Sequence, residues 1–383
     1  TFFKDNTMFS QIKRITLYNV KNMSKRFLIT STSDEVVLES VKDVGVITLN
    51  RPKALNALNL SMVRQLLPVL KEWEREKSVV IIRGAGEKAF CAGGDVIAVV
   101  ESGKAGDDLG AQFFRTEYTV NALIGSYQKP YIALIDGITM GGGVGLSVHG
   151  KYRVATDRTL FAMPETAIGL FPDVGGSYFL PRLRGKIGLY LGLTGHRLKG
   201  SDVYKAGIAT HYVASESMND LQLDLTDCRN HDDVKKCLDK YQVNDGLPFE
   251  LEPVLQNIDA CFSGQTVEDI IKRLDEDGSE WALSTLNAMK KMSPTSLKLT
   301  FTQLQRGAEM KSLAECLQME YTMAVHSLQN PDFHEGVRAR LIDKDNKPMW
   351  TPNQLEVITE HHIERFFRRL SLDEELRLVD TSK

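Results

Sequence analysis

Met140-Gly-Gly-Gly-Val-Gly145 follows the apolar run 131–135 and precedes Leu-Ser-Val-His at 146–149. An apolar run, a glycine cluster and a second apolar run predict a strand, a tight turn and the start of a helix. Glycine permits positive φ and lets another atom approach the main chain closely. The N–H groups of a first helical turn have no internal partner and favour an anion. We therefore expect this turn to present backbone N–H groups to negative charge.

A second glycine turn, Cys91-Ala-Gly-Gly-Asp95, comes after the apolar strand predicted at 79–82. Two such turns can aim two N–H groups at one developing oxyanion. A glycine cluster can also be only a tight turn with close helix packing, and this alternative stays open. A dinucleotide-binding fingerprint is disfavoured because the third glycine that it requires is replaced by Leu146 or Val148.

Composition excludes several classes of function. The chain has 383 residues with 47 basic and 50 acidic side chains, a net charge of −3, which argues against nucleic acid or an anionic membrane as partner. No apolar run approaches the ~20 residues that span a bilayer. The five cysteines are scattered and the histidines show no metal-binding spacing, so we expect a reducing compartment and no metal site.

The first 32 residues differ in composition from the rest. No acid occurs between Asp5 and Asp34, and the basic residues alternate with apolar, hydroxyl and amide side chains. This composition resembles a mitochondrial transit peptide, which is removed before folding. A disordered basic tail is the alternative. The basic residues are Lys13, Arg14, Lys21, Lys25 and Arg26.

The pattern along the chain divides it into two further parts. Strands alternate with helices in residues 33–245, which predicts an α/β core of stacked turns. Its first helix begins after the N-cap Asn59, and Pro68 should kink that helix or shift its start. Residues 246–383 show mainly helical periodicity and predict a helical C-terminal region. The predicted strands are 35–41, 44–50, 78–83, 131–135, 151–155 and 160–163, the first two forming a hairpin.

Three carboxylates lie near the glycine turns in sequence. Glu165 and Asp173 occur in loops rich in proline and glycine, where desolvation raises the pKa and the basicity of a carboxylate. Glu117 lies on a helix predicted at 113–124. Less specific roles are open for all three, because the first two can cap following helices and Glu117 can be a solvated helix residue.

Two candidate nucleophiles are weaker. Ser147 is the centre of a near match to the G-x-S-x-G elbow, but His149 occupies the position that must be small. Cys91 lies beside the first glycine turn, yet no histidine spacing identifies a partner for it. A small buried cysteine is the favoured interpretation.

Several stretches resemble the crotonase (enoyl-CoA hydratase/isomerase) superfamily in the same order along the chain. The resemblance implies an α/β fold, a crotonase-like spiral of ββα units, followed here by the helical C-terminal region. Further stretches are similar to the 3-hydroxyisobutyryl-CoA hydrolases of that superfamily. The superfamily stretches are 47–58, 84–95, 129–145, 161–176 and 332–339, and those of the hydrolases include 114–118, 137–150, 292–296 and 341–345.

The resemblance implies hydrolysis of the thioester of 3-hydroxyisobutyryl-CoA, and of 3-hydroxypropionyl-CoA, in valine degradation in the mitochondrial matrix. Hydratases of the superfamily carry one Glu soon after the triple glycine and a second in a later Pro-Glu loop. Gly145 occupies the first position here and Glu165 the second. Since one acid/base group for adding water to C=C is missing, hydration or isomerisation of an enoyl-CoA ranks second. A non-catalytic acyl-CoA-binding protein is the third alternative.

The resemblance also implies roles for individual residues. The backbone N–H groups of Gly94 and Gly142 form the oxyanion hole. Glu165 is catalytic, either as nucleophile or as general base, and Asp173 is the second catalytic acid. Glu117 binds the substrate's 3-hydroxyl group, and the substrate site includes Gly142, Glu165 and Asp173 as well.

Lys53 and Ala54 correspond to the part of the family that binds the adenine end of CoA. Because the thioester is already activated, no metal or cofactor is expected, and CoA is part of the substrate. An acyl-CoA is therefore the expected partner, with neither nucleic acid nor membrane. Superfamily members are commonly trimers or hexamers, so a homo-oligomer is possible, but the hydrolase branch can differ in its tail and the sequence leaves the oligomeric state open.

Overall fold

The computed structural model describes residues 26–28 and 34–378, and its sheet begins with the predicted hairpin. Strands β2 (Val36–Val41) and β3 (Val44–Leu49) pair in continuous antiparallel register, with Val36 opposite Leu49. Strand β1 (Arg26–Leu28) pairs antiparallel with β2. It falls within the predicted transit peptide 1–32, whose other residues lie outside the described part of the chain.

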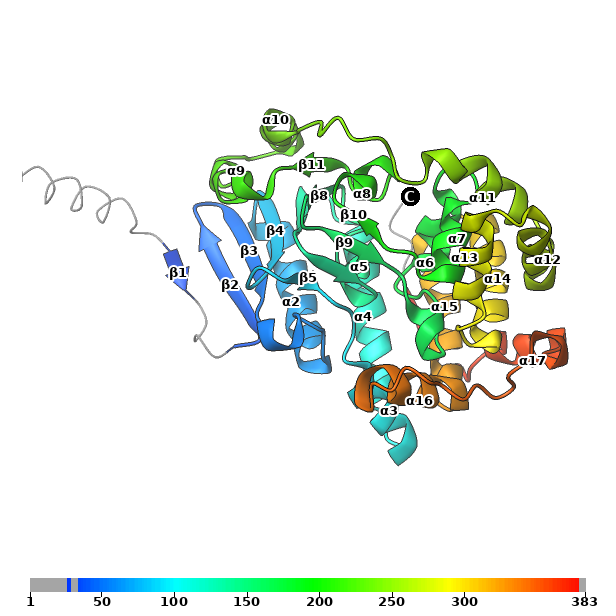
Figure 1. The fold of residues 1–383 in the computed structure, drawn as a ribbon. Coiled ribbons are helices and arrows are strands. Elements are labelled where there is room, and N and C mark those ends of the chain that lie inside the picture. Colours follow the sequence, from blue (N-terminus) through cyan, green and yellow to red (C-terminus); the bar gives the residue numbers. More distant parts are fainter. Residues whose placement is uncertain (1–25, 29–33, 379–383) are drawn as a thin grey trace, which may run out of the picture.

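Two sheets form the α/β core (Figure 1). From β3 onward the larger sheet is parallel, in the order β1-β2-β3-β4-β6-β8-β11, and the smaller has the order β10-β9-β7-β5. Strands β4, β6 and β8 of the larger sheet are each followed by a short strand of the smaller one, which gives the predicted spiral of paired strands. These strands are β4 (Val79–Gly84), β5 (Ala89–Cys91), β6 (Tyr131–Ile135), β7 (Ile138–Met140), β8 (Tyr152–Thr156), β9 (Leu160–Ala162), β10 (Leu198–Lys199) and β11 (His211–Val213).

Helix α2 (Leu60–Glu76) covers one face of the core together with α4 (Leu109–Gly125). The side chain of Asn59 accepts a hydrogen bond from the Met62 N–H at 2.9 Å, which confirms the predicted cap. Of the two alternatives predicted for Pro68, the shifted helix start is wrong, because Pro68 lies inside a helix that already begins at Leu60, and the kink stays a prediction. Five apolar side chains on one stripe are buried and hold the helix in place: Met62, Val63, Leu66, Leu70 and Trp73.

The opposite face of the larger sheet has a separate small core. Helices α9 (Met218–Leu225) and α10 (His231–Tyr241) cover it and bury Leu225 and Leu238 against the strands. Since both faces of the parallel strands are buried, the strands are apolar without alternation. Neither helix was predicted from the sequence pattern.

The described chain after β11 consists of helices and connecting segments, with no strand between residues 214 and 378. Helices α14 (Pro294–Glu309) and α15 (Leu313–Ser327) pack on α6 (Gly176–Phe179), and α15 also packs on α4. None of the described helices has both the length and the apolar character needed to cross a membrane. The remaining helices of four or more residues include α3 (Val96–Ala105), α5 (Gly142–Gly145), α7 (Ile187–Thr194), α8 (Ser201–Lys205), α11 (Leu255–Cys261), α12 (Val267–Asp277), α13 (Glu280–Met289), α16 (Pro331–Val337) and α17 (Glu360–Glu364).

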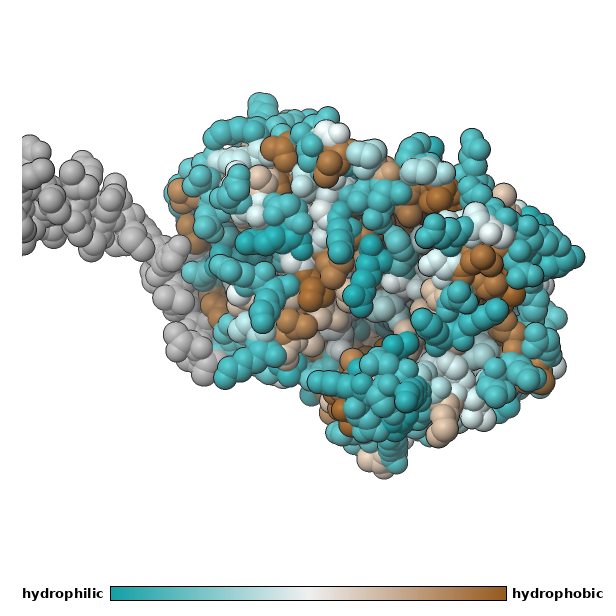
Figure 2. Space-filling model, in the orientation of Figure 1, coloured by the Kyte–Doolittle hydropathy of each residue, from teal (hydrophilic) through white to brown (hydrophobic). Residues whose placement is uncertain are grey.

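The face of the molecule seen in Figure 2 is mostly hydrophilic, with apolar residues in scattered groups.

Helix α16 packs against the short helix η2 (Glu165–Ile168) and is followed by the π-helical turn η6 (Arg338–Ile342). The helical region therefore reaches back to the loop that carries Glu165.

Candidate active site

The first glycine turn is paired with the segment before α2. The Leu58 N–H donates to the Gly93 carbonyl at 2.8 Å, and the Asp95 N–H donates to the Leu58 carbonyl at 2.7 Å. These two bonds involve the Gly93 carbonyl and the Asp95 N–H, which flank Gly94. In an extended segment successive N–H groups point to opposite sides, so the Gly94 N–H points away from Leu58. It donates to no acceptor within the part of the chain that the structure describes. This N–H is therefore available for an oxyanion.

The second glycine turn lies directly beside the first. Gly142 begins α5, so its N–H has no acceptor within the helix. A methyl group added to Gly142 would lie 3.4 Å from the Gly94 nitrogen and 2.4 Å from Glu117 Oε1. One added to Gly141, which has a φ of 46°, would lie 3.0 Å from Glu165 Oε1. Only glycine leaves room for these carboxyls next to the two expected oxyanion donors.

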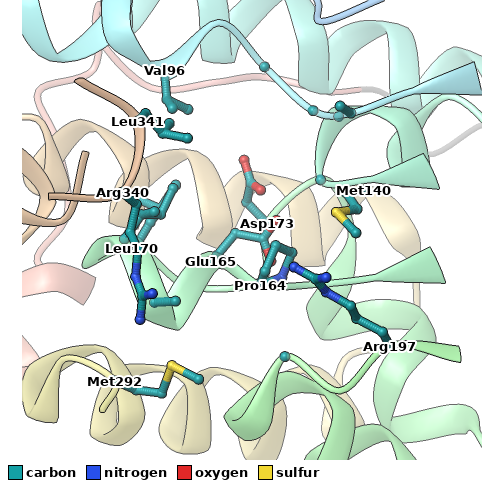
Figure 3. A pocket seen from close by; sticks show the side chains of 18 of the residues that line it. Val96, Met140, Pro164, Glu165, Leu170, Asp173, Arg197, Met292, Arg340 and Leu341 are labelled. Atoms are coloured by element: carbon teal, nitrogen blue, oxygen red, sulfur yellow. The ribbon is translucent and has the colours of Figure 1, made fainter. Parts of the chain in front are cut away.

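Glu117, Glu165 and Asp173, here called the acid end, meet in one pocket of about 500 Å³. Figure 3 shows Glu165 and Asp173 in this pocket. Their exposed fractions are 2%, 5% and 5%. The alternative of a solvated Glu117 is wrong, because α4 is packed between α2 and α15. The capping alternative is wrong for Asp173, since Gly175 is the N-cap of α6 and no side chain caps it.

The carboxyls of the acid end perturb one another. Burial raises the pKa of Glu117, and the charges of Asp173 and Glu165 raise it further. Burial and the charge of Asp173 likewise raise the pKa of Glu165. Burial raises the pKa of Asp173 only to about 6, because the Tyr118 hydroxyl donates a 2.8 Å hydrogen bond to its carboxyl and favours the charged form. Charge therefore resides first on Asp173.

Two oxygens at the acid end are ready for a ligand. Glu117 Oε1 and Glu165 Oε2 are buried and have no hydrogen-bond partner among the described residues. Buried polar atoms are normally paired, so an unpaired pair in a pocket marks a place where substrate groups can bind. A protonated carboxyl can donate there and an ionised one can accept.

Arg197 and Arg340, here called the arginine end, line the same pocket (Figure 3), and Arg340 is half-buried. Arg197 is exposed and, within residues 34–378, has neither an acidic partner nor a hydrogen bond. Arg340, on η6, donates from Nη1 to Asn346 Oδ1 at 2.9 Å. Apolar side chains, Met292 and Leu341 among them, line the pocket beside these two guanidinium groups. The pocket thus joins a positive opening to an acidic interior.

Gly145 has no space for the glutamate that hydratases carry. A methyl group there would lie 2.7 Å from Val174 Cβ and 2.8 Å from Asn121 Nδ2.

Lys53 and Ala54 are exposed on the short helix η1 (Pro52–Ala54) and do not line the pocket, so their proposed contact with CoA stays a prediction.

The two weaker nucleophiles have other roles. Ser147 Oγ donates to the carbonyls of Gly143 and Val144 at 3.0 Å each, and His149 Nε2 bonds to a backbone carbonyl instead of the serine. Cys91 is fully buried, and burial raises the pKa of its thiol to about 12. No cluster of three or more metal-binding side chains occurs in the described ranges.

Sequence reasoning missed the residues that support Asp173. Val174 has a φ of 51°, a conformation that costs a non-glycine residue on the order of 1–3 kcal/mol. Tyr118 lies on the helix predicted at 113–124 and received no role there, although its hydroxyl donates to the Asp173 carboxyl. Glu320 lies on the buried stripe of α15, and an acid at such a helical position was an available signal.

Comparison with known proteins identifies the family to which the chain belongs. The model of the family described as "Enoyl-CoA hydratase/isomerase" matches residues 44–367. A 3-hydroxyisobutyryl-CoA hydrolase from Danio rerio is 53% identical over 96% of this chain and 98% of its own, and one from Xenopus laevis is 58% identical over 85% and 86%. The chain belongs to the 3-hydroxyisobutyryl-CoA hydrolases of the enoyl-CoA hydratase/isomerase family. Both relatives are named mitochondrial, which supports a mitochondrial location for this family member.

A solved structure agrees with the fold. A carnitinyl-CoA dehydratase from Mycobacterium thermoresistibile superposes with a TM-score of 0.85 at 38% identity, covering 90% of this chain and 99% of its own. The crotonase-like spiral with a helical C-terminal region is therefore confirmed.

Proposed function

We propose that this family member hydrolyses the thioester of 3-hydroxyisobutyryl-CoA, and of 3-hydroxypropionyl-CoA, to free CoA and the hydroxy acid, in valine catabolism in the mitochondrial matrix. The observation that carries the proposal is the meeting of both glycine turns with the three buried carboxyls in one pocket. Membership among the hydrolases supports the choice of substrate. The chemistry needs no cofactor beyond the CoA of the substrate.

In this mechanism the thioester carbonyl oxygen lies between the N–H groups of Gly94 and Gly142. Attack on the carbonyl carbon makes a tetrahedral oxyanion, which both N–H groups stabilise. Glu165 either attacks directly, forming an anhydride that water then cleaves, or removes a proton from the attacking water. In both routes the C–S bond breaks and the CoA sulfur leaves with a proton.

The charge distribution at the acid end matches these roles. Because charge resides first on Asp173, the proton of Glu165 can pass to the Asp173 carboxylate as Glu165 begins to act as nucleophile or base. The pKa of Glu117 is raised as well, so Glu117 keeps its proton and can hydrogen-bond the 3-hydroxyl group of the substrate. A site that pairs with a hydroxyl rejects analogues without it, since its own polar group would remain buried and unpaired.

The arginine end suits the phosphate groups of CoA. Guanidinium groups bind phosphates through paired N–H donors, and Arg340 Nε is a buried donor without a partner in the described chain. The apolar surface between the arginines and the acids is suited to the pantetheine arm. In this assignment Lys53 and Ala54 take the adenine end, on the outer side of the first glycine turn.

The deciding experiment measures thiol release from 3-hydroxyisobutyryl-CoA, isobutyryl-CoA and crotonyl-CoA with the wild type and Glu165→Gln. We expect release from the hydroxy substrate, strong discrimination against isobutyryl-CoA, and loss of turnover in the variant. Product analysis with crotonyl-CoA tests the second candidate function, hydration, which the blocked space at Gly145 disfavours. Hydration of crotonyl-CoA, or thiol release at the same rate in wild type and Glu165→Gln, would contradict the proposed mechanism. Binding of acyl-CoA without any turnover would indicate a non-catalytic protein.

A further inference from the structure

The Val174–Gly175 peptide group, one residue beyond Asp173, is held at both ends by buried side chains. The Val174 carbonyl accepts a hydrogen bond from His149 Nε2 at 2.7 Å. The N–H of the same peptide, on Gly175, donates to Glu320 Oε2 at 2.6 Å. Since a carbonyl oxygen only accepts, the proton of the neutral His149 ring is on Nε2. The peptide cannot rotate without breaking a buried hydrogen bond, which leaves a polar group unpaired.

Glu320 ties this loop to the helical region through four donors. Besides Gly175, its carboxylate accepts from Ser177 N–H at 2.8 Å, from Ser177 Oγ at 2.5 Å and from Gln303 Nε2 at 3.3 Å. Gln303 Nε2 also donates to the Pro172 carbonyl at 2.7 Å. The backbone is therefore anchored both before and after the acid, by side chains of α14 and α15.

The anchoring matters because the loop is strained. Val174 is β-branched and buried, yet its φ of 51° lies in the left-handed region, where such residues are rare. A residue persists there only when the surrounding structure determines its conformation. If the anchors were lost, Val174 would return to negative φ and carry the adjacent Asp173 with it.

We propose that His149 and Glu320 are positioning residues for the hydrolysis, which hold the Val174–Gly175 peptide so that the Asp173 carboxyl faces Glu165. The proposal rests on the proposed function. It explains why the helical region bears a buried acid that touches no part of the pocket. The α/β core supplies His149 and the helical region supplies Glu320, so the two parts of the chain hold the acid jointly.

The test uses Glu320→Gln and His149→Phe in the full chain, with kcat and KM for 3-hydroxyisobutyryl-CoA. Each variant keeps the shape of the side chain but removes one hydrogen bond to the peptide. We expect kcat to fall roughly 10- to 100-fold, because a small misplacement of a catalytic group lowers the rate by such a factor. We expect KM to change less than about threefold, because the groups that bind substrate are untouched. Val174→Gly should recover part of the kcat lost in Glu320→Gln, since glycine adopts this φ without strain.

The matched control is Leu225→Ala, which destabilises the separate core under the larger sheet. It should lower the melting temperature while leaving kcat unchanged. An unchanged kcat in folded Glu320→Gln and His149→Phe, an equal loss in the control, or no recovery with Val174→Gly would overturn the proposal. If Glu320→Gln does not fold, Ser177→Ala, which removes only one donor to Glu320, decides by the same kcat and KM criteria. An inactive wild type would instead refute the proposed function.

Discussion

The two ends of the pocket are built in opposite ways. At the acid end each carboxyl is at most 5% exposed, and the Tyr118 hydroxyl holds that of Asp173. At the arginine end Arg197 is exposed on the segment before β10, and Arg340 lies on a π-helical turn of the other part of the chain. Groups that take part in bond making must keep a fixed geometry, whereas charges that attract a flexible ligand can remain solvated. This contrast predicts losses of kcat at one end and losses of binding at the other.

The largest effect is expected at the acid end from Gly142→Ala. Its methyl group would lie 2.4 Å from Glu117 Oε1 and displace an oxyanion donor. Loss of such a donor costs about 2.7–4 kcal/mol in other acyl-transfer enzymes, so kcat should fall about 10²- to 10³-fold. Steady-state thiol release measures this. Gly192→Ala, within α7, is the matched control and should retain the wild-type kcat. Equal rates for both variants would show that the second glycine turn is not part of the oxyanion hole.

Asp173→Asn, also at the acid end, should raise the free energy of unfolding at neutral pH. The pKa of Asp173 is about 6 in the folded protein against 3.8 for the ordinary carboxyl. The folded state therefore binds the proton more tightly, and stability is lost as the pH rises from 3.8 through 6. The variant should be more stable by about 3 kcal/mol at pH 7.5, and the difference should vanish below about pH 4. Denaturant unfolding at both pH values measures it. A variant less stable than wild type at pH 7.5 would mean that Asp173 is not under electrostatic strain.

The smallest effect is expected at the arginine end. Arg197→Ala and Arg340→Ala should each lower kcat/KM for the CoA thioester about 10- to 150-fold, mainly through KM, because charge-assisted hydrogen bonds contribute roughly 1.5–3 kcal/mol. The corresponding pantetheine thioester lacks the phosphates of the nucleotide and should be hydrolysed equally by the variants and the wild type. Arg184→Ala, an exposed arginine outside the pocket, is the control. Equal losses on both thioesters would place the arginines near the acyl group instead.

The local elements of the fold follow from short stretches of sequence. Alternation and turn residues predicted the β2–β3 hairpin, and an asparagine before an apolar helical stripe predicted the start of α2. The glycine turns were also readable, because the requirement for close backbone approach concerns only neighbouring residues. Strands β5 and β7 were missed, since three residues carry too little periodicity to identify a strand.

The candidate site likewise combines features that the local sequence determines with features that depend on tertiary structure. The sequence by itself, through its motifs, determined the family, the two glycine turns and the loops that carry Glu165 and Asp173. Only the tertiary structure decided that Glu117 is buried, that Glu320 reaches the loop after Asp173, and that both arginines flank one opening. The physical reason is that backbone conformation depends on adjacent residues. Burial, hydrogen bonding and pKa depend on segments that folding brings together from distant parts of the chain.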